Sequence, residues 1–285
     1  MNAQLECLPC LGRNAVDAAR RSTGDSDLRH CIVCESFKLL SANRLDQPPP
    51  FTARQILDIA EKHTGIADVY KEEKRRSNRL AEQLVAQLAA IPEYDPASFE
   101  SRLRLAVAGN ILDFGIFGDL DIAAAMNVVR SAFTRPLPLD AVQRLQEKME
   151  SAQRILYILD NCGEAVFDRV FMEPYRHKIT IAVRGRPAFN DVTADDLPEC
   201  RLDNFAAGWI ANGPTGIPGV ILDHCSPEFR GVFGSSDLII AKGQGNFETM
   251  NVYDAPIAFL FMAKCPVVVR LLEAEMNSLQ VRLTF

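Results

Sequence analysis

Apolar residues in the first 133 positions of the chain recur at the spacing of amphipathic helices. The segments that show this spacing most clearly are Leu5–Ala19, Leu28–Leu40, Ala53–Ala60 and Leu80–Ile91. The dense charge run Lys71–Arg79 is most simply a solvated helix face. The pattern therefore predicts an all-helical region over residues 1–133.

After the linker Thr134–Pro138, the pattern changes to short apolar runs that alternate with helical stretches. The runs have the length of strands and are Ile155–Leu159, Ile179–Val183, Gly208–Ala211, Leu238–Ala241 and Pro266–Val269. Such alternation is typical of α/β proteins, in which helices cover both faces of a mainly parallel sheet. We therefore expect a three-layer α/β/α domain with a Rossmann-like sheet over residues 134–285.

Polar side chains follow the first predicted strand directly. Asp160 and Asn161 end the apolar run, Cys162-Gly163 allows a tight turn, and Glu164 is an acidic residue in the first turn of a helix. Open α/β sheets bind ligands at the carboxyl edge of their strands. A carboxylate beside a carboxamide supplies hard oxygen ligands, which suit Mg²⁺ or Mn²⁺ better than zinc. The alternative is that Asp160 or Asn161 only caps the helix.

Two further predicted strands also end in polar residues. Asp191 follows the second strand and could complete a metal site, although a turn residue is the preferred interpretation if this motif is taken alone. Lys242 leaves the fourth strand into a loop with Gly243 and Gly245, whose backbone N–H groups could hold an anion. The ammonium group suits a phosphate. The loop has neither Walker A spacing nor the dinucleotide-binding glycine pattern.

The N-terminal region carries two C-x-x-C pairs, Cys7 with Cys10 and Cys31 with Cys34. Four cysteines in this arrangement could hold a structural Zn²⁺ ion. Both pairs also fall on predicted helices, where a three-residue spacing places two small thiols on one apolar face. Hydrophobic packing is the preferred interpretation, and zinc is the alternative.

Composition excludes several classes of function. A net charge of −6 argues against a nucleic-acid partner. No apolar run is long enough to span a bilayer, and the first residues lack the features of a signal peptide, so we expect a cytoplasmic protein with no membrane partner and with reduced thiols. No Ser-His-Asp or Cys-His arrangement indicates a covalent hydrolase. Nothing in the sequence indicates an oligomeric state.

Taken together, these motifs resemble the damage-control phosphatase family, once catalogued as domain of unknown function eighty-nine. The segments that carry the resemblance are Asp160–Glu164, Asn190–Thr193, Lys242–Asn246 and Asn110–Gly115, with Cys7–Cys10 and Lys74–Asn78 as in its prokaryotic branch. The resemblance covers nearly the whole chain. It implies a helical region packed on a three-layer α/β domain that hydrolyses small phosphate monoesters with a divalent metal. The substrates implied are sugar phosphates or phosphopantetheine-like compounds, as damaged or surplus metabolites.

The resemblance also implies roles for individual residues. Asp160, Asn161 and Asp191 would bind Mn²⁺, Mg²⁺, Co²⁺ or Ni²⁺, and Lys242 would contact the phosphate. Further substrate or phosphate contacts would come from Asn110, Gly163, Gly243, Gly245 and Asn246. Glu164 or Asp113 would transfer protons or position water. The sequence departs from the family at Cys162, where a small residue such as alanine is usual, and in the segment after Cys200.

Two other functions are compatible with the residues. One is transfer of a methyl group from S-adenosylmethionine to carboxyl side chains, although the loop after the first strand is poor in the glycines that such a cofactor favours. The other is a non-catalytic module that binds a phosphorylated metabolite without releasing phosphate.

Overall fold

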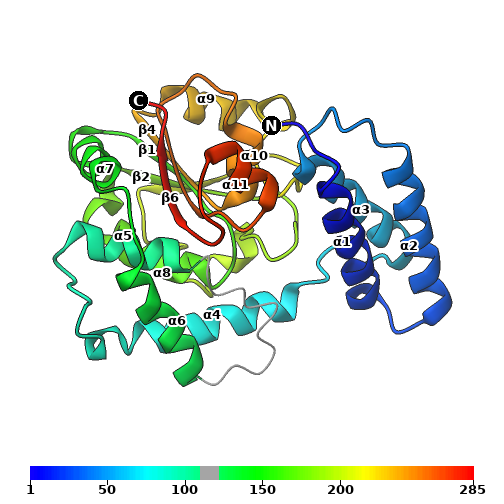
Figure 1. Ribbon diagram of the computed structural model, residues 1–285, viewed down its shortest axis with the longest axis horizontal. Coiled ribbons are helices and arrows are strands. Elements are labelled where there is room, and N and C mark those ends of the chain that lie inside the picture. Colours follow the sequence, from blue (N-terminus) through cyan, green and yellow to red (C-terminus); the bar gives the residue numbers. More distant parts are fainter. Residues whose placement is uncertain (110–121) are drawn as a thin grey trace.

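The computed structural model describes residues 1–109 and 122–285, and Figure 1 shows how its elements are arranged. A six-stranded sheet has the order β3-β2-β1-β4-β5-β6. The strands are β1 (Ile155–Ile158), β2 (Ile179–Val183), β3 (Gly208–Ala211), β4 (Leu238–Lys242), β5 (Ile257–Met262) and β6 (Leu279–Leu283). All neighbours pair in parallel except β6, which runs antiparallel to β5. The carboxyl ends of β1, β2 and β4 therefore meet at one edge.

Helices cover both faces of this sheet. Successive residues of β1 contribute to different hydrophobic clusters, Tyr157 to one and Leu156 to the other, as the pleat of a strand requires. The first cluster also contains Leu103, Leu145 and other residues from α5 (Phe99–Ala108), α7 (Leu139–Ser151) and α8 (Glu164–Met172). The second contains residues from α9 (Pro227–Ser235), α10 (Gln244–Met250) and α11 (Pro266–Leu272). The predicted three-layer α/β/α fold is confirmed.

The N-terminal residues form helices, as predicted. α1 (Cys7–Ser22), α2 (Ser26–Ser41) and α3 (Pro49–Thr64) pack against one another and lie to one side of the sheet, coloured blue in Figure 1. α3 also contacts α10, which joins this group to the sheet layer. α4 (Lys71–Val85) packs against α8 and against α6 (Ile122–Thr134). The described part of residues 1–133 contains no strand.

The last predicted strand is wrong. Pro266–Val269 begins the helix α11, with Pro266 in its first turn, where proline lacks only an N–H that would have no helical partner. Val267 and Val268 are buried by packing of the helix. The sheet is completed instead by β5 and β6, which were not predicted.

The division of the chain at residue 134 stays a prediction. One hydrophobic cluster contains Val129 from the first part and Leu145 from the second, so the two parts share buried contacts. Among the described residues, no helix is long and apolar enough to cross a membrane.

Candidate active site

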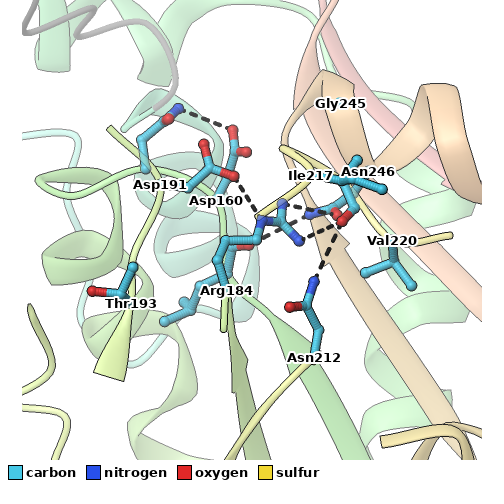
Figure 2. A network of polar contacts seen from close by, with 12 residues as sticks. Asp160, Arg184, Asp191, Thr193, Asn212, Ile217, Val220, Gly245 and Asn246 are labelled. Atoms are coloured by element: carbon cyan, nitrogen blue, oxygen red, sulfur yellow. Dashed lines mark hydrogen bonds and ion pairs between the residues drawn. The ribbon is translucent and has the colours of Figure 1, made fainter. Parts of the chain in front are cut away.

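The loops after β1 and β2 are fastened to each other by their backbones. Asn161 and Asp191 form an isolated antiparallel bridge. Cys162 N–H donates to the carbonyl of Asn190 at 2.8 Å, and Val192 N–H donates to the carbonyl of Asp160 at 2.9 Å. These bonds bring Asp160, Asn161 and Asp191 together at the carboxyl edge of the sheet, and Figure 2 shows the side chains of Asp160 and Asp191 side by side.

Arg184 holds the carboxylate of Asp191 in one orientation by a buried ion pair. Its Nε donates to Asp191 Oδ2 at 2.7 Å and its Nη2 to Asn246 Oδ1 at 3.1 Å, so the guanidinium lies between the two side chains (Figure 2). The third nitrogen, Nη1, donates to the carbonyl of Gly219 at 3.1 Å. Because Oδ2 is held by Arg184, Asp191 has a fixed orientation in which Oδ1 is available to a ligand.

The amide of Asn161 is oriented by acceptors on one side. Its Nδ2 donates to Asp160 Oδ2 at 2.9 Å and lies 3.5 Å from Glu164 Oε2. This assignment places the amide oxygen on the opposite side of the group, where it can ligate a cation.

Two glycines shape the loops on either side of Asp160. Gly163 has φ +80°, and its N–H donates to Asn78 Oδ1 at 2.6 Å. Gly243 has φ +79°, and a Cβ there would lie 1.9 Å from Asp160 Oδ2. Its N–H donates to the carbonyl of Leu260 at 3.0 Å. Both N–H groups are therefore engaged within the protein, and the phosphate contacts of Gly163 and Gly243 stay predictions.

Lys242 is enclosed by acceptors. Its side chain is fully buried, and Nζ donates to Glu164 Oε1 and Asp168 Oδ1, both at 2.6 Å, and to the carbonyl of Ala106 at 3.0 Å. An ammonium group has three N–H donors, and all three are used. A direct contact of Lys242 with the phosphate would require one of these bonds to be given up, and it stays a prediction. The residue links β4 to α8 and α5.

Asn246 is also an internal residue. It is fully buried, its Oδ1 accepts from Arg184, and its Nδ2 donates to the carbonyl of Lys242 at 2.6 Å. Its amide links the guanidinium of Arg184 to the backbone of β4, and a contact of Asn246 with the substrate stays a prediction. Gly245, by contrast, lines the pocket described below.

The site carries an excess of buried negative charge. Burial raises the pKa of Asp160 well above its usual range, and the charges of Asp191 and Glu164 add to the effect. Burial likewise raises the pKa of Asp191, although Arg184 opposes the shift. Asp191, Glu164 and Asp168 pair with the buried cations Arg184 and Lys242, and Asp160 is a fourth carboxylate affected by the charges of both. A divalent cation beside them would offset the remaining charge and favour their ionised forms.

The donor set fits such an ion. Two carboxylates and an amide oxygen are hard ligands of the kind that Mg²⁺ and Mn²⁺ prefer. No group of three or more His, Cys, Asp or Glu side chains suited to a metal ion occurs within residues 1–109 and 122–285. The candidate site therefore depends on the amide of Asn161 as its third protein ligand.

A pocket of about 330 Å³ opens onto these three side chains. Its remaining walls come from α1, α3, α10, the loops after β2 and β3, and the loop before α11. They include Leu11, Pro50, Ala53, Phe189, Pro218, Gln244, Gly245 and Glu248. The volume suits a small organic molecule attached to the group bound at the sheet edge.

Comparison with known proteins identifies the family. Residues 3–279 match the damage-control phosphatase ARMT1-like domain. The chain belongs to this family.

Two relatives and one solved structure illustrate the likeness. A damage-control phosphatase of Pyrococcus horikoshii is 33% identical over 98% of this chain and 97% of its own length. A damage-control phosphatase of Archaeoglobus fulgidus is 32% identical over 93% of each chain. A crystal structure of a DUF89 family protein from Pyrococcus horikoshii has 32% identity and a TM-score of 0.90 over the full length of both chains.

The four cysteines considered as a possible zinc site, Cys7, Cys10, Cys31 and Cys34, do not form a metal-binding cluster among the described residues. All four are free thiols; Cys7 is buried, whereas Cys10, Cys31 and Cys34 are exposed. Cys7 and Cys10 line the pocket together with Cys265. Cys34 Sγ lies 3.5 Å from His30 Nε2 on the outer surface of α2.

Several residues that support the site were missed. Arg184 directly follows β2, just as Lys242 ends β4. A charged residue at the end of an apolar strand was therefore the sequence signal that could have identified Arg184 as part of the site. Asp168 lies one helical turn after Glu164 on α8. Lys74 and Asn78 belong to the charge run predicted to be solvated, yet both are only 1% exposed. Lys74 Nζ donates to Asp196 Oδ2 at 2.7 Å.

Two candidates, Asn110 and Asp113, lie outside the described residues. Their predicted roles in substrate binding and proton transfer stay predictions.

Proposed function

We propose that this protein is a divalent-metal-dependent phosphatase that hydrolyses small phosphate monoesters. The observation that carries the proposal is the convergence of Asp160, Asn161 and Asp191, with an excess of buried carboxylates, at one end of a ligand-sized pocket. The names of the two archaeal relatives support the phosphatase activity. Sugar phosphates and phosphopantetheine-like esters remain the proposed substrates.

Asp160, Asn161 and Asp191 would hold the ion, with Mn²⁺, Mg²⁺, Co²⁺ and Ni²⁺ as the candidates. The ion supplies positive charge and Lewis acidity at the phosphoryl group when it is bound. Arg184 keeps Asp191 in one orientation, and Asp160 and Glu164 keep the amide of Asn161 in one orientation. The site is thereby arranged before the substrate arrives, which lowers the cost of reaching the transition state.

Glu164 is held in place by Lys242 and lies beside Asn161. This arrangement favours a positioning role, and proton transfer by Glu164 stays a prediction. The apolar walls of the pocket would exclude water from the alcohol part of the ester.

The test is phosphate release from p-nitrophenyl phosphate and a panel of sugar phosphates after treatment with EDTA, followed by addition of each metal. We expect activity only with a metal. Asp160→Ala should lower kcat/KM by more than about 100-fold, because loss of a group that merely supports a ligand already costs up to about that much. Asp140→Ala, at an exposed position of α7, is the matched control and should retain activity.

Full activity of Asp160→Ala, or of the EDTA-treated protein, would contradict the metal assignment. If the folded protein releases no phosphate with any metal, the chain is better described as a module that binds a phosphorylated metabolite.

A further inference from the structure

Glu248 is a buried carboxylate in the wall of the candidate substrate pocket. It lies on α10, is 8% exposed and lines the pocket together with Asp160 and Asp191. Its Oε1 accepts a hydrogen bond from Gln244 Nε2 at 2.7 Å. Glu248 is neither one of the proposed metal ligands nor one of the carboxylates that pair with Lys242 or Arg184, so its burial in the pocket wall needs another explanation.

The position of Glu248 relative to the metal site follows from α10. Gly243, immediately before the helix, contacts Asp160, whereas Gln244 and Glu248 lie four residues apart on one face. Four residues of helix rise by about 6 Å. A phosphate at Asp160 would therefore leave its alcohol part within reach of Glu248.

The described side chains that line the pocket offer this carboxylate no counter-charge. None of the described residues that line the pocket is a lysine, arginine or histidine. Residues 110–121, which lie outside the described part, contain no such residue in their sequence. Lys242 and Arg184 are bound to other carboxylates. The α-amino group of Met1 donates to the backbone carbonyl of Glu248 at 2.5 Å, and its charge lowers the pKa of the Glu248 carboxyl, but burial has the larger effect and raises that pKa.

A second carboxylate at the rim, Glu6, differs in this respect. Its Oε1 lies 2.8 Å from Arg270 Nη2, and both side chains are largely exposed. Solvent and Arg270 therefore offset its charge, so Glu6 is a suitable comparison for Glu248.

We infer that Glu248 determines which phosphate monoesters the pocket accepts, favouring alcohol parts with hydroxyl or ammonium donors and rejecting those with a second anionic group. This inference rests on the proposed phosphatase function. Hydroxyl and ammonium groups can donate to a buried carboxylate, and such charge-assisted bonds are strong. A carboxylate or second phosphate would be brought against a like charge in a pocket without cationic side chains, which should lower kcat/KM for such an ester.

The test compares two esters of nearly equal size, glycerol 3-phosphate and 3-phosphoglycerate, which differ in that a carboxylate replaces a hydroxymethyl group. Assays are run at pH 8.5, because burial raises the pKa of Glu248 to about 7. We expect the wild type to prefer glycerol 3-phosphate by at least about tenfold in kcat/KM. In Glu248→Gln the preference should fall to within about threefold, since the amide is neutral and can still accept from Gln244.

Glu6→Gln is the matched control and should keep the wild-type preference. Each preference is a ratio within one preparation, so partial loss of folded protein cancels. The wild-type ratio tests the inference even if a variant fails to fold. Equal use of the two esters by the wild type, or an unchanged preference in folded Glu248→Gln, would overturn it. Hydrolysis of p-nitrophenyl phosphate but of neither glycerol derivative would also overturn it, whereas no release from any ester would contradict the phosphatase proposal itself.

Discussion

At the scale of single residues, Gly243 shows how tightly the site is built. Its positive φ favours glycine, and the space that a Cβ would need is taken by the carboxylate of Asp160. The residue therefore lets β4 pass close behind a candidate metal ligand.

Gly243→Ala should displace Asp160 and strain the backbone. We expect activity to fall by more than about tenfold, and the free energy of unfolding to fall by roughly 1–3 kcal/mol. Phosphate-release kinetics and urea unfolding measure the two effects. Gly231→Ala, in α9 with no atom within 4 Å of the added Cβ, is the control and should be neutral or slightly stabilising. An active Gly243→Ala protein would mean that Asp160 does not need this position.

The sequence contained enough information to bring Asp160, Asn161 and Asp191 to one edge, because each follows a strand and parallel strands share a carboxyl edge. It did not contain the partners of those side chains. Lys242 follows a strand in the same way, yet its ammonium turns inward to Glu164 and Asp168. A strand-end position defines the edge on which a residue lies, whereas packing of α8 and α5 decides where its side chain points.

At the scale of elements, the buried ammonium of Lys242 connects β4 with α8 and α5. Burial opposes its charge, but the carboxylates of Asp168 and Glu164 outweigh that effect and raise the pKa of Lys242. Tyr157 on β1 adds a hydrogen bond from its hydroxyl to Asp168 Oδ1 at 2.8 Å. The contact between these elements therefore depends on charges that compensate one another.

Lys242→Met should leave two buried carboxylates without their cation and lower the free energy of unfolding by about 3–5 kcal/mol. Combining it with Glu164→Gln and Asp168→Asn should recover much of that loss. Urea unfolding provides the measurement, and Lys264→Met, at an exposed position, is the control. If Lys242→Met is as stable as the wild type but has a raised KM for phosphate esters, the residue contacts the phosphate, as the sequence predicted.

The error at Pro266–Val269 also belongs to the element scale. Three consecutive valines favour a strand locally, but Pro266 suits the first turn of a helix and Val267 and Val268 are buried on α11. The strand that follows β4 in the chain and pairs with it is β5, whose six residues are all buried. Hydrophobic burial was predictable for both segments. The choice between helix and strand depended on tertiary packing, which overrides a local preference of this size.

At the scale of the whole molecule, Glu248 should make stability depend on pH. Burial raises its pKa from 4.5 to about 7, so the folded protein holds this proton more tightly than the unfolded chain. The stability associated with the protonated form is fully present below about pH 4.5 and is lost as the pH rises through 7.

Glu248→Gln should therefore gain stability relative to the wild type between pH 5 and pH 8. The expected gain is of the order of 1–3 kcal/mol, with the upper value set by about 1.4 kcal/mol for each pKa unit. Urea unfolding of both proteins at the two pH values separates the contribution of Glu248 to the free energy of unfolding, because every other titratable group is present in both proteins. A difference between the proteins that is the same at pH 5 and pH 8 would show that the carboxyl group is not buried as described.

The order of strands has a consequence for the way in which the chain reaches its native state. Ile155 of β1 pairs with Leu238 of β4, 83 positions later in the sequence. Pairing over such a distance is slow, because the entropy cost of closing a long loop comes before the stabilising contacts between the strands have formed. Asp160 is in place only when Gly243 and α10 have docked beside it. A chain emerging from the ribosome therefore has no complete pocket until Cys265 has been synthesised, so ligand binding would report that the strands around β1 and β4 have assembled.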